Sequence, residues 1–81
     1  MTLGYSDTFL EALADAPDSV QKAFYKQSRF LLVNLQHPSL HAKKYDERRG
    51  IWQARVNRSW RFYFLIQGDT YYLIDIIPHP K

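Results

Sequence analysis

Apolar residues near the start of the chain recur at the spacing of a helix. A first helix is expected over residues 6–14, and Ser6 or Asp7 is placed to cap it. One face of this helix would carry Phe9, Leu10 and Leu13. These three side chains are expected to point toward a core.

A second helix is expected over residues 17–36. Pro17 suits a first helical turn, because the N–H that proline lacks has no helical partner there. Pro38 ends the helix. Its apolar face is a stripe of 3.6-residue period made of Val20, Phe24, Leu31 and Leu35. The short link between the two helices predicts an antiparallel helical hairpin.

Beyond residue 50 the period of the pattern changes to two, which is typical of half-buried strands. Strands are expected over residues 51–57, 60–66 and 71–77, and the segment QGDT before the last strand has the composition of a turn. Short connections predict an antiparallel meander, and residues 2–5 could add an edge strand. The fold class is therefore α+β, with a two-helix N-terminal hairpin packed on a three- to four-stranded antiparallel sheet.

The alternation also assigns the strand residues to the two faces of the sheet. The face beneath the helices is predicted to carry Trp52, Ala54, Val56, Trp60, Phe62, Phe64, Ile66, Tyr72, Ile74 and Ile76. Among them, Trp52, Phe62, Phe64 and Ile74 are expected to be buried. The opposite, open face is predicted to carry Arg55, Arg61, Tyr63 and Asp75. Arg58, in the turn between two strands, should stand at the rim of this face.

Length and composition restrict the possible classes of protein. The 81 residues suffice for one domain, residues 1–81. The chain has no cysteine, which excludes thiol catalysis and cysteine-based zinc sites and fits a reducing cytoplasm. Its apolar runs, such as FLLV, are far shorter than a membrane span, and the N-terminus lacks the pattern of a signal peptide. We therefore expect a cytoplasmic protein with no membrane partner.

The net charge of +3 conceals a strong gradient along the chain. Residues 1–20 contain acidic side chains but no lysine or arginine, whereas residues 41–61 contain seven lysines and arginines against two acidic residues. Such a basic segment fits a polyanion such as nucleic acid, or an acidic protein segment. The alternative is that these charges only solubilise the domain, with Arg55 and Arg61 paired to Asp75.

The segment HPSLHAKKYDERRGIWQARVNRSWRFYF, together with the order of two helices and three strands, resembles the RelE/ParE superfamily of bacterial toxins from toxin–antitoxin systems. The resemblance rests on the spacing of the Pro-Ser-Leu turn, the lysine pair, Trp52, Arg55 and Arg61. It implies a metal-free activity that needs no cofactor, and a cognate antitoxin that holds the toxin inactive. RelE-like members cut mRNA on the ribosome, whereas ParE-like members inhibit DNA gyrase.

The resemblance also implies roles for individual residues. In RNA cleavage a 2′-hydroxyl attacks the adjacent phosphate, which requires a base, an acid and cations near the phosphorane. Arg61 matches the arginine that would hold the scissile phosphate, and Arg55 matches a basic position that stabilises charge. The predicted RNA contacts are Lys43, Lys44, Arg58 and Tyr63. Gln53 stands where some members have a second catalytic lysine, a departure that favours the gyrase-directed or catalytically silent alternative.

The three histidines differ in what the sequence expects of them. His79 follows the last strand, where some relatives place a catalytic histidine, and Pro78 and Pro80 flank it. It is therefore the predicted proton carrier. His41 lies in the basic connection and could contact phosphate, and His37 suits a helix end. No pair of histidines has the spacing of a metal site on one helix, so no metal is expected.

These inferences predict an mRNA endoribonuclease that acts at the ribosome and is neutralised by an antitoxin. A gyrase-directed or catalytically silent relative is the second candidate. A plain nucleic-acid-binding module, without chemistry, is the third.

Overall fold

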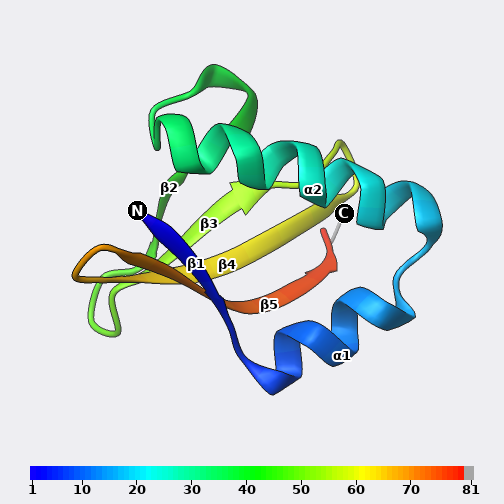
Figure 1. Ribbon diagram of the computed structural model, residues 1–81, viewed down its shortest axis with the longest axis horizontal. Helices are drawn as coiled ribbons and strands as arrows, with labels where there is room; N and C mark the ends of the chain where they lie inside the picture. Colours follow the sequence, from blue (N-terminus) through cyan, green and yellow to red (C-terminus); the bar gives the residue numbers. More distant parts are fainter. Residues whose placement is uncertain (80–81) are drawn as a thin grey trace.

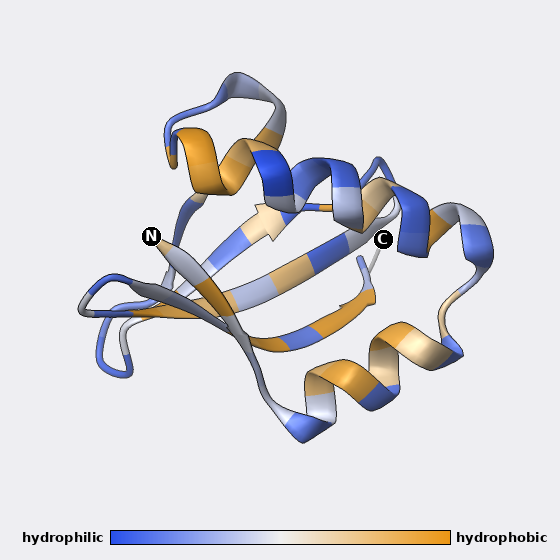
Figure 2. Cartoon of the chain, viewed as in Figure 1, coloured by the Kyte–Doolittle hydropathy of each residue, from blue (hydrophilic) through white to orange (hydrophobic). Residues whose placement is uncertain are grey.

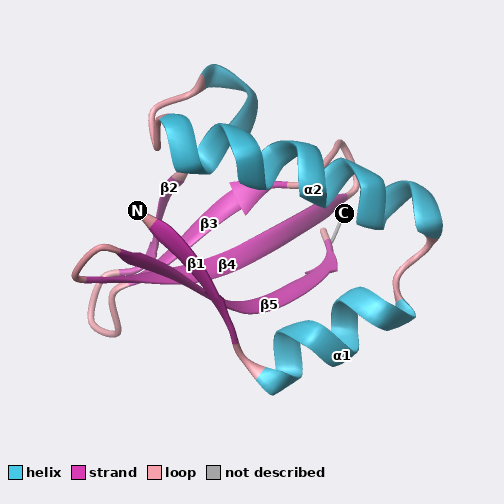
Figure 3. Cartoon of the chain, in the orientation of Figure 1, coloured by secondary structure: helices cyan, strands magenta, loops and turns pink. Residues whose placement is uncertain are grey.

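The computed structural model describes residues 1–79. In chain order its elements are β1 (Thr2–Tyr5), α1 (Asp7–Asp15), α2 (Asp18–Val33), the 3₁₀-helix η1 (Pro38–Leu40), β2 (Lys43–Asp46), β3 (Ile51–Arg55), β4 (Trp60–Gln67) and β5 (Thr70–Pro78) (Figure 1). Figure 3 shows that α2 lies across the sheet and that α1 lies next to β5. No helix in the described part of the chain is long and apolar enough to cross a membrane.

The five strands form one mixed sheet, in the order β1-β5-β4-β3-β2. β1 runs parallel to β5, and the other neighbouring strands are antiparallel. The predicted α+β class is confirmed, but the sheet has one strand more than the upper expectation and is not purely antiparallel. The extra strand is β2, whose exposed and polar residues give no alternating signal. β1 can run parallel because two helices, and not a hairpin, follow it.

Each helix begins one residue later than predicted, with Ser6 and Pro17 at the N-cap positions, and the second helix ends earlier. Ser6 caps α1, with its Oγ accepting a hydrogen bond from the N–H of Phe9 at 3.0 Å. α2 ends at Val33, although the pattern extended it to residue 36. The side chain of Asn34 accepts a hydrogen bond from the N–H of Gln36 at 2.9 Å. This local turn competes with the helix and ends it.

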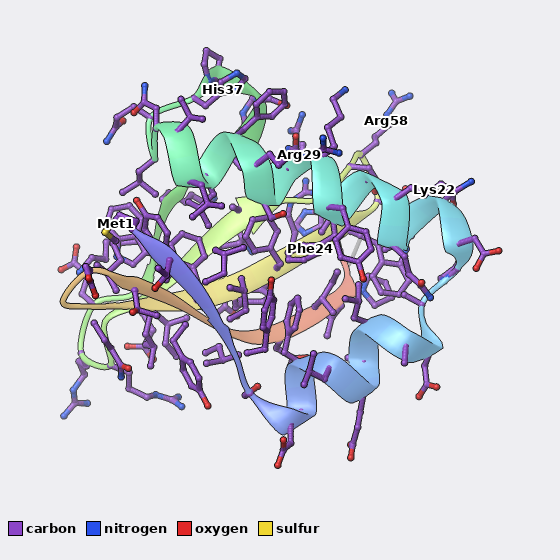
Figure 4. All side chains as sticks on the ribbon, in the orientation of Figure 1. Met1, Lys22, Phe24, Arg29, His37 and Arg58 are labelled. Carbon is purple, nitrogen blue, oxygen red and sulfur yellow. The ribbon has the colours of Figure 1, made fainter. Side chains whose placement is uncertain are left out.

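An aromatic core joins both helices to the sheet. Phe9 of α1 packs on Phe24 of α2 with ring centroids 5.0 Å apart, and Phe24 meets Phe62 of β4 edge-on at 5.3 Å. Figure 4 shows Phe24 between α2 and the sheet. Phe62 and Phe64 are fully buried, and Trp52 packs against this core while partly exposed. The predicted faces of β3 and β4 are therefore correct along their central residues.

In β5 the prediction is correct for Ile76 but wrong for Ile74, because this strand contains a β-bulge. Tyr63 pairs with Asp75 but Phe64 pairs with Leu73, which leaves Ile74 as an extra residue. Tyr71, Leu73 and Ile76 consequently enter the core, while Ile74, expected to be buried there, lines a shallow hollow on the opposite face.

Two further assignments from the alternation also fail. Tyr72 pairs with Leu65 and lies outside the buried core. Ile66 stays 39% exposed, near the hairpin between β4 and β5. Along β5 almost every residue is apolar, so a pattern of period two cannot reveal where the extra residue lies. In Figure 2 a hydrophilic segment interrupts the orange part of β5, where the sequence has Asp75 between isoleucines.

Candidate functional site

Two arginines face each other across neighbouring strands on the open face of the sheet. Arg55 of β3 is directly opposite Arg61 of β4, and both side chains are half-buried. Like charges at such a position destabilise a sheet unless something compensates them. The alternative pairing with Asp75 is not seen among residues 1–79, and the Asp75 carboxylate instead accepts a hydrogen bond from the N–H of Ile76 at 2.9 Å. Within residues 1–79 the one salt bridge joins Arg49 and Asp46, away from this pair.

Backbone carbonyls, instead of a carboxylate, hold the Arg61 side chain. Its Nη1 donates to the carbonyl oxygens of Asn57 at 2.8 Å and Trp60 at 3.0 Å. The Asn57 side chain shapes this turn by accepting hydrogen bonds from the N–H groups of Ser59 and Trp60. Burial and the charge of Arg55 lower the pKa of Arg61, but a guanidinium stays protonated at neutral pH. The result is a fixed cation.

Arg55 is held in a different way and is left with an unused donor. Its carbonyl oxygen accepts a hydrogen bond from Nε2 of Gln27, on α2, at 2.8 Å. Its Nε is buried and has no hydrogen-bond partner among the described residues. A buried donor without a partner costs about 1–3 kcal/mol, so the folded protein tolerates a cost at this position.

The two arginines line a cleft of about 370 Å³ on the open face. Its lining residues are His41, Ala42, Lys43, Gln53, Arg55, Arg61 and His79. They come from the segment after η1, from three different strands and from the end of β5. No acidic residue of the described chain is among them, so the cleft presents cationic groups and imidazole rings to solvent.

The β3–β4 turn restrains His79 as well as Arg61. The N–H of His79 donates to the carbonyl oxygen of Ser59 at 2.6 Å, directly after the end of β5. The same turn thus holds the side chain of Arg61 and the backbone of His79, two residues that are predicted to act together. Pro80, which the sequence placed beside His79, lies outside the described residues.

A second hollow of about 420 Å³ adjoins the cleft on the side of α2. It is lined by Ala23, Lys26, Gln27, Ser39, His41, Arg55, Val56 and Asn57. His41 and Arg55 line both spaces and therefore stand at their junction.

Solved structures resemble this chain, although no protein-family model and no curated protein matches it significantly. The YoeB/ParE toxin from Agrobacterium tumefaciens gives a TM-score of 0.79 at 14% identity, over 99% of this chain and 100% of that one. A metal-bound toxin from Helicobacter pylori gives 0.76 at 16% identity, over 98% and 94%. The toxin–antitoxin complex RelBE2 from Mycobacterium tuberculosis gives 0.74 at 17%, over 96% of each chain. This chain has the RelE/ParE toxin fold.

On this RelE/ParE fold, the two predicted lysines lie on opposite faces of the sheet. Lys43 pairs with Gln53 and lines the cleft. Lys44 pairs with Trp52, and its Nζ lies 5.4 Å from the centroid of that ring in a cation–π contact. The structure therefore separates Lys44 from Arg55 and the cleft. The predicted contact of Lys44 with RNA is untested, and it would have to occur on the opposite face of the sheet from the cleft.

Tyr63 is less available to a ligand than the sequence suggested. It is only 7% exposed, and its hydroxyl accepts a hydrogen bond from Nε2 of Gln53 at 2.9 Å. The edge of its ring meets the ring of Tyr45, with the centroids 4.9 Å apart. Tyr45 is 61% exposed and is the better candidate for stacking on a base. It was missed because its segment was interpreted as an irregular connection.

The remaining predicted residues do not line the cleft. Arg58 is exposed in the β3–β4 turn and projects into solvent (Figure 4). His37 has a local structural role, since its Nδ1 accepts a hydrogen bond from the N–H of Ser39 and its ring stacks on Phe30 at 3.9 Å. Within residues 1–79 no three histidine or acidic side chains gather as metal ligands.

Proposed function

We propose that this protein is the toxin of a type II toxin–antitoxin system and cleaves mRNA on the ribosome without a metal ion. One observation carries the proposal. A cleft on the open face of the sheet gathers Lys43, Arg55, Arg61 and His79 and includes no acidic side chain of residues 1–79. The cytoplasm is the compartment in which such a toxin would meet its ribosome.

The proposed reaction needs only groups that this cleft contains. The 2′-oxygen loses its proton to a base and forms a bond to the adjacent phosphorus. The bond from phosphorus to the 5′-oxygen breaks, and that oxygen takes a proton from an acid. The products are a 2′,3′-cyclic phosphate and a free 5′-hydroxyl. Negative charge grows on the non-bridging oxygens during this step, and fixed cations stabilise it without rearranging.

Each residue has a role that follows from how it is held. Arg61 is anchored through Nη1, so its other N–H groups can clamp the phosphate in a forked arrangement. Arg55 brings a buried Nε without a partner, which an anionic oxygen would satisfy. His79 carries a proton. Lys43, and Arg58 at the rim, would contact the RNA backbone.

The proposed partner in the resting state is a cognate antitoxin. Structures with this fold include RelB–RelE complexes from Methanococcus jannaschii and Escherichia coli. Beside the basic cleft of this chain, an apolar hollow is lined by Tyr45, Ile51, Tyr63, Ile74, Asp75 and Ile77. A segment with apolar and acidic side chains would fit both surfaces at once and cover Arg61.

A ParE-like action on gyrase is the second candidate, and Gln53 favours it. Where a catalytic lysine is expected for the ribonuclease, this glutamine is only 8% exposed and donates to Tyr63. It therefore adds no charge to the cleft. The same cationic face could then serve for protein binding.

Induced expression in bacteria, with mRNA ends mapped by primer extension, tests the proposal. We expect growth arrest with new cleavage sites inside translated messages, and both effects should be strongly reduced in Arg61→Ala. Arg49→Ala removes an equal charge from a salt bridge outside the cleft and should act as the wild type does. Arrest with intact messages and lost gyrase supercoiling would favour the ParE-like action instead.

A further inference from the structure

His41 has an unusual backbone conformation at the point where the two hollows meet. Its φ of 47° and ψ of 42° lie in the left-handed region, and it is the only non-glycine residue within residues 1–79 with a positive φ. Such a conformation is uncommon for residues that carry a Cβ. Strained backbone that the surrounding structure enforces is often found at functional sites.

A buried amide fixes the segment that leads into His41. Nε2 of Gln27 donates to the carbonyl oxygens of Ser39 and Arg55, at 2.9 and 2.8 Å. Its Oε1 accepts a hydrogen bond from Oγ of Ser39 at 2.9 Å. The next residue, Leu40, is fully buried in the core. Gln27 of α2 thus connects two segments through hydrogen bonds: η1, which precedes His41, and the end of β3, which carries Arg55.

This arrangement presents an imidazole to the same cleft that His79 lines. The charged and titratable side chains that share the two hollows with His41 are Lys26 of α2, Lys43 of β2, Arg55 of β3, Arg61 of β4 and His79 after β5. Arginines keep their protons at neutral pH. Histidine is the side chain suited both to take and to give a proton there.

We propose that His41 is a second catalytic histidine, and that it performs one of the two proton transfers of RNA cleavage while His79 performs the other. The inference rests on the proposed ribonuclease function. One imidazole takes the proton of the 2′-hydroxyl as the bond between the 2′-oxygen and phosphorus forms. The other gives its proton to the 5′-oxygen as the bond from phosphorus to that oxygen breaks. Gln27 is a positioning residue for this pair.

The pH dependence of cleavage by ribosome-bound protein tests the assignment. The wild type should give a bell-shaped profile with one limb for each imidazole. His41→Asn keeps a residue type that tolerates the left-handed backbone. It should lose about 10²–10⁴-fold in rate and one limb, and His79→Asn should lose the other limb. His37→Asn is the matched control, since His37 lies in the same segment but lines neither hollow, and it should keep both limbs.

A second variant separates catalysis from folding. His41→Gly relieves the backbone strain and removes the ring, so added imidazole should restore part of the lost rate in this variant alone. A slow His41→Asn that keeps both limbs, with no imidazole rescue of His41→Gly, would make His41 structural only and overturn the inference. So would His41→Asn at the wild-type rate while Arg61→Ala is inactive. A wild type that cleaves at no pH would instead refute the proposed function itself.

Discussion

At the scale of single residues, the candidate site combines two features that work against stability. Arg55 and Arg61 face each other on adjacent strands, and the Nε of Arg55 is buried without a partner in the described chain. Burial and the charge of Arg55 lower the pKa of Arg61, so the folded protein disfavours the charged form of this side chain. A protein that keeps such a pair gains something from it. In our account, the gain is a pair of cations already arranged around a phosphate.

Arg55→Met tests this residue-scale interpretation. Methionine preserves much of the length of the side chain but removes the buried donor and the repulsion with Arg61. We expect the free energy of unfolding, measured in urea, to rise by about 1 kcal/mol while the cleavage rate falls. A loss of stability of that size would mean that Arg55 is held by contacts that stabilise the fold.

At the scale of elements, Gln27 is the contact that joins α2 to both sides of the site. In Gln27→Leu the carbonyl oxygens of Ser39 and Arg55 would lose their partner in a buried environment. Each such group costs about 1–3 kcal/mol, so we expect unfolding in urea at clearly lower concentration, together with slower cleavage. Gln21→Leu is the control, because Gln21 lies on the same helix and its amide bonds to Ala16, outside the cleft. Equal effects of the two substitutions on cleavage would contradict this role of Gln27.

The strands differ in how well the sequence predicted them. The period-two pattern gave the correct faces for Arg55, Arg61 and Phe62, because their neighbours differ sharply in polarity. It was wrong for Ile74, because a bulge within an almost wholly apolar strand changes no residue type. β2 was missed because its residues are mainly exposed and a register shift interrupts its pairing. The position of a bulge or an edge strand depends on the strand with which it pairs. The residue pattern of one segment carries no information about that neighbouring strand.

The residues of the candidate site also fall into those that the sequence predicted and those that it did not. The sequence brought Arg55, Arg61, Lys43 and His79 together through the strand pattern and the family resemblance. For His41 the sequence predicted only a phosphate contact, because it does not reveal a left-handed backbone. It predicted no role for Gln27, because the hydrogen bonds of this side chain join segments that are distant in the sequence. Tyr45 shows a third case, in which an exposed aromatic residue belongs to a strand that was not predicted.

At the scale of the whole molecule, charge is distributed over two sides of the sheet. Lys43 lines the cleft, whereas Lys44 lies over Trp52 on the face that packs against the core. If RNA lies along the cleft, its affinity should fall steeply as salt rises. Lys43→Ala should weaken binding and reduce the salt slope by about one, and Lys44→Ala should do so less. Equal losses, measured by filter binding over a salt series, would place RNA across both faces.

The single-turnover rate of cleavage of ribosome-bound mRNA shows whether Arg61 clamps a scissile phosphate. We expect Arg61→Ala to cleave about 10–10³-fold more slowly than the wild type, and to keep its thermal unfolding transition. Arg49→Ala should retain the wild-type rate. Cleavage by Arg61→Ala at the wild-type rate would contradict the account.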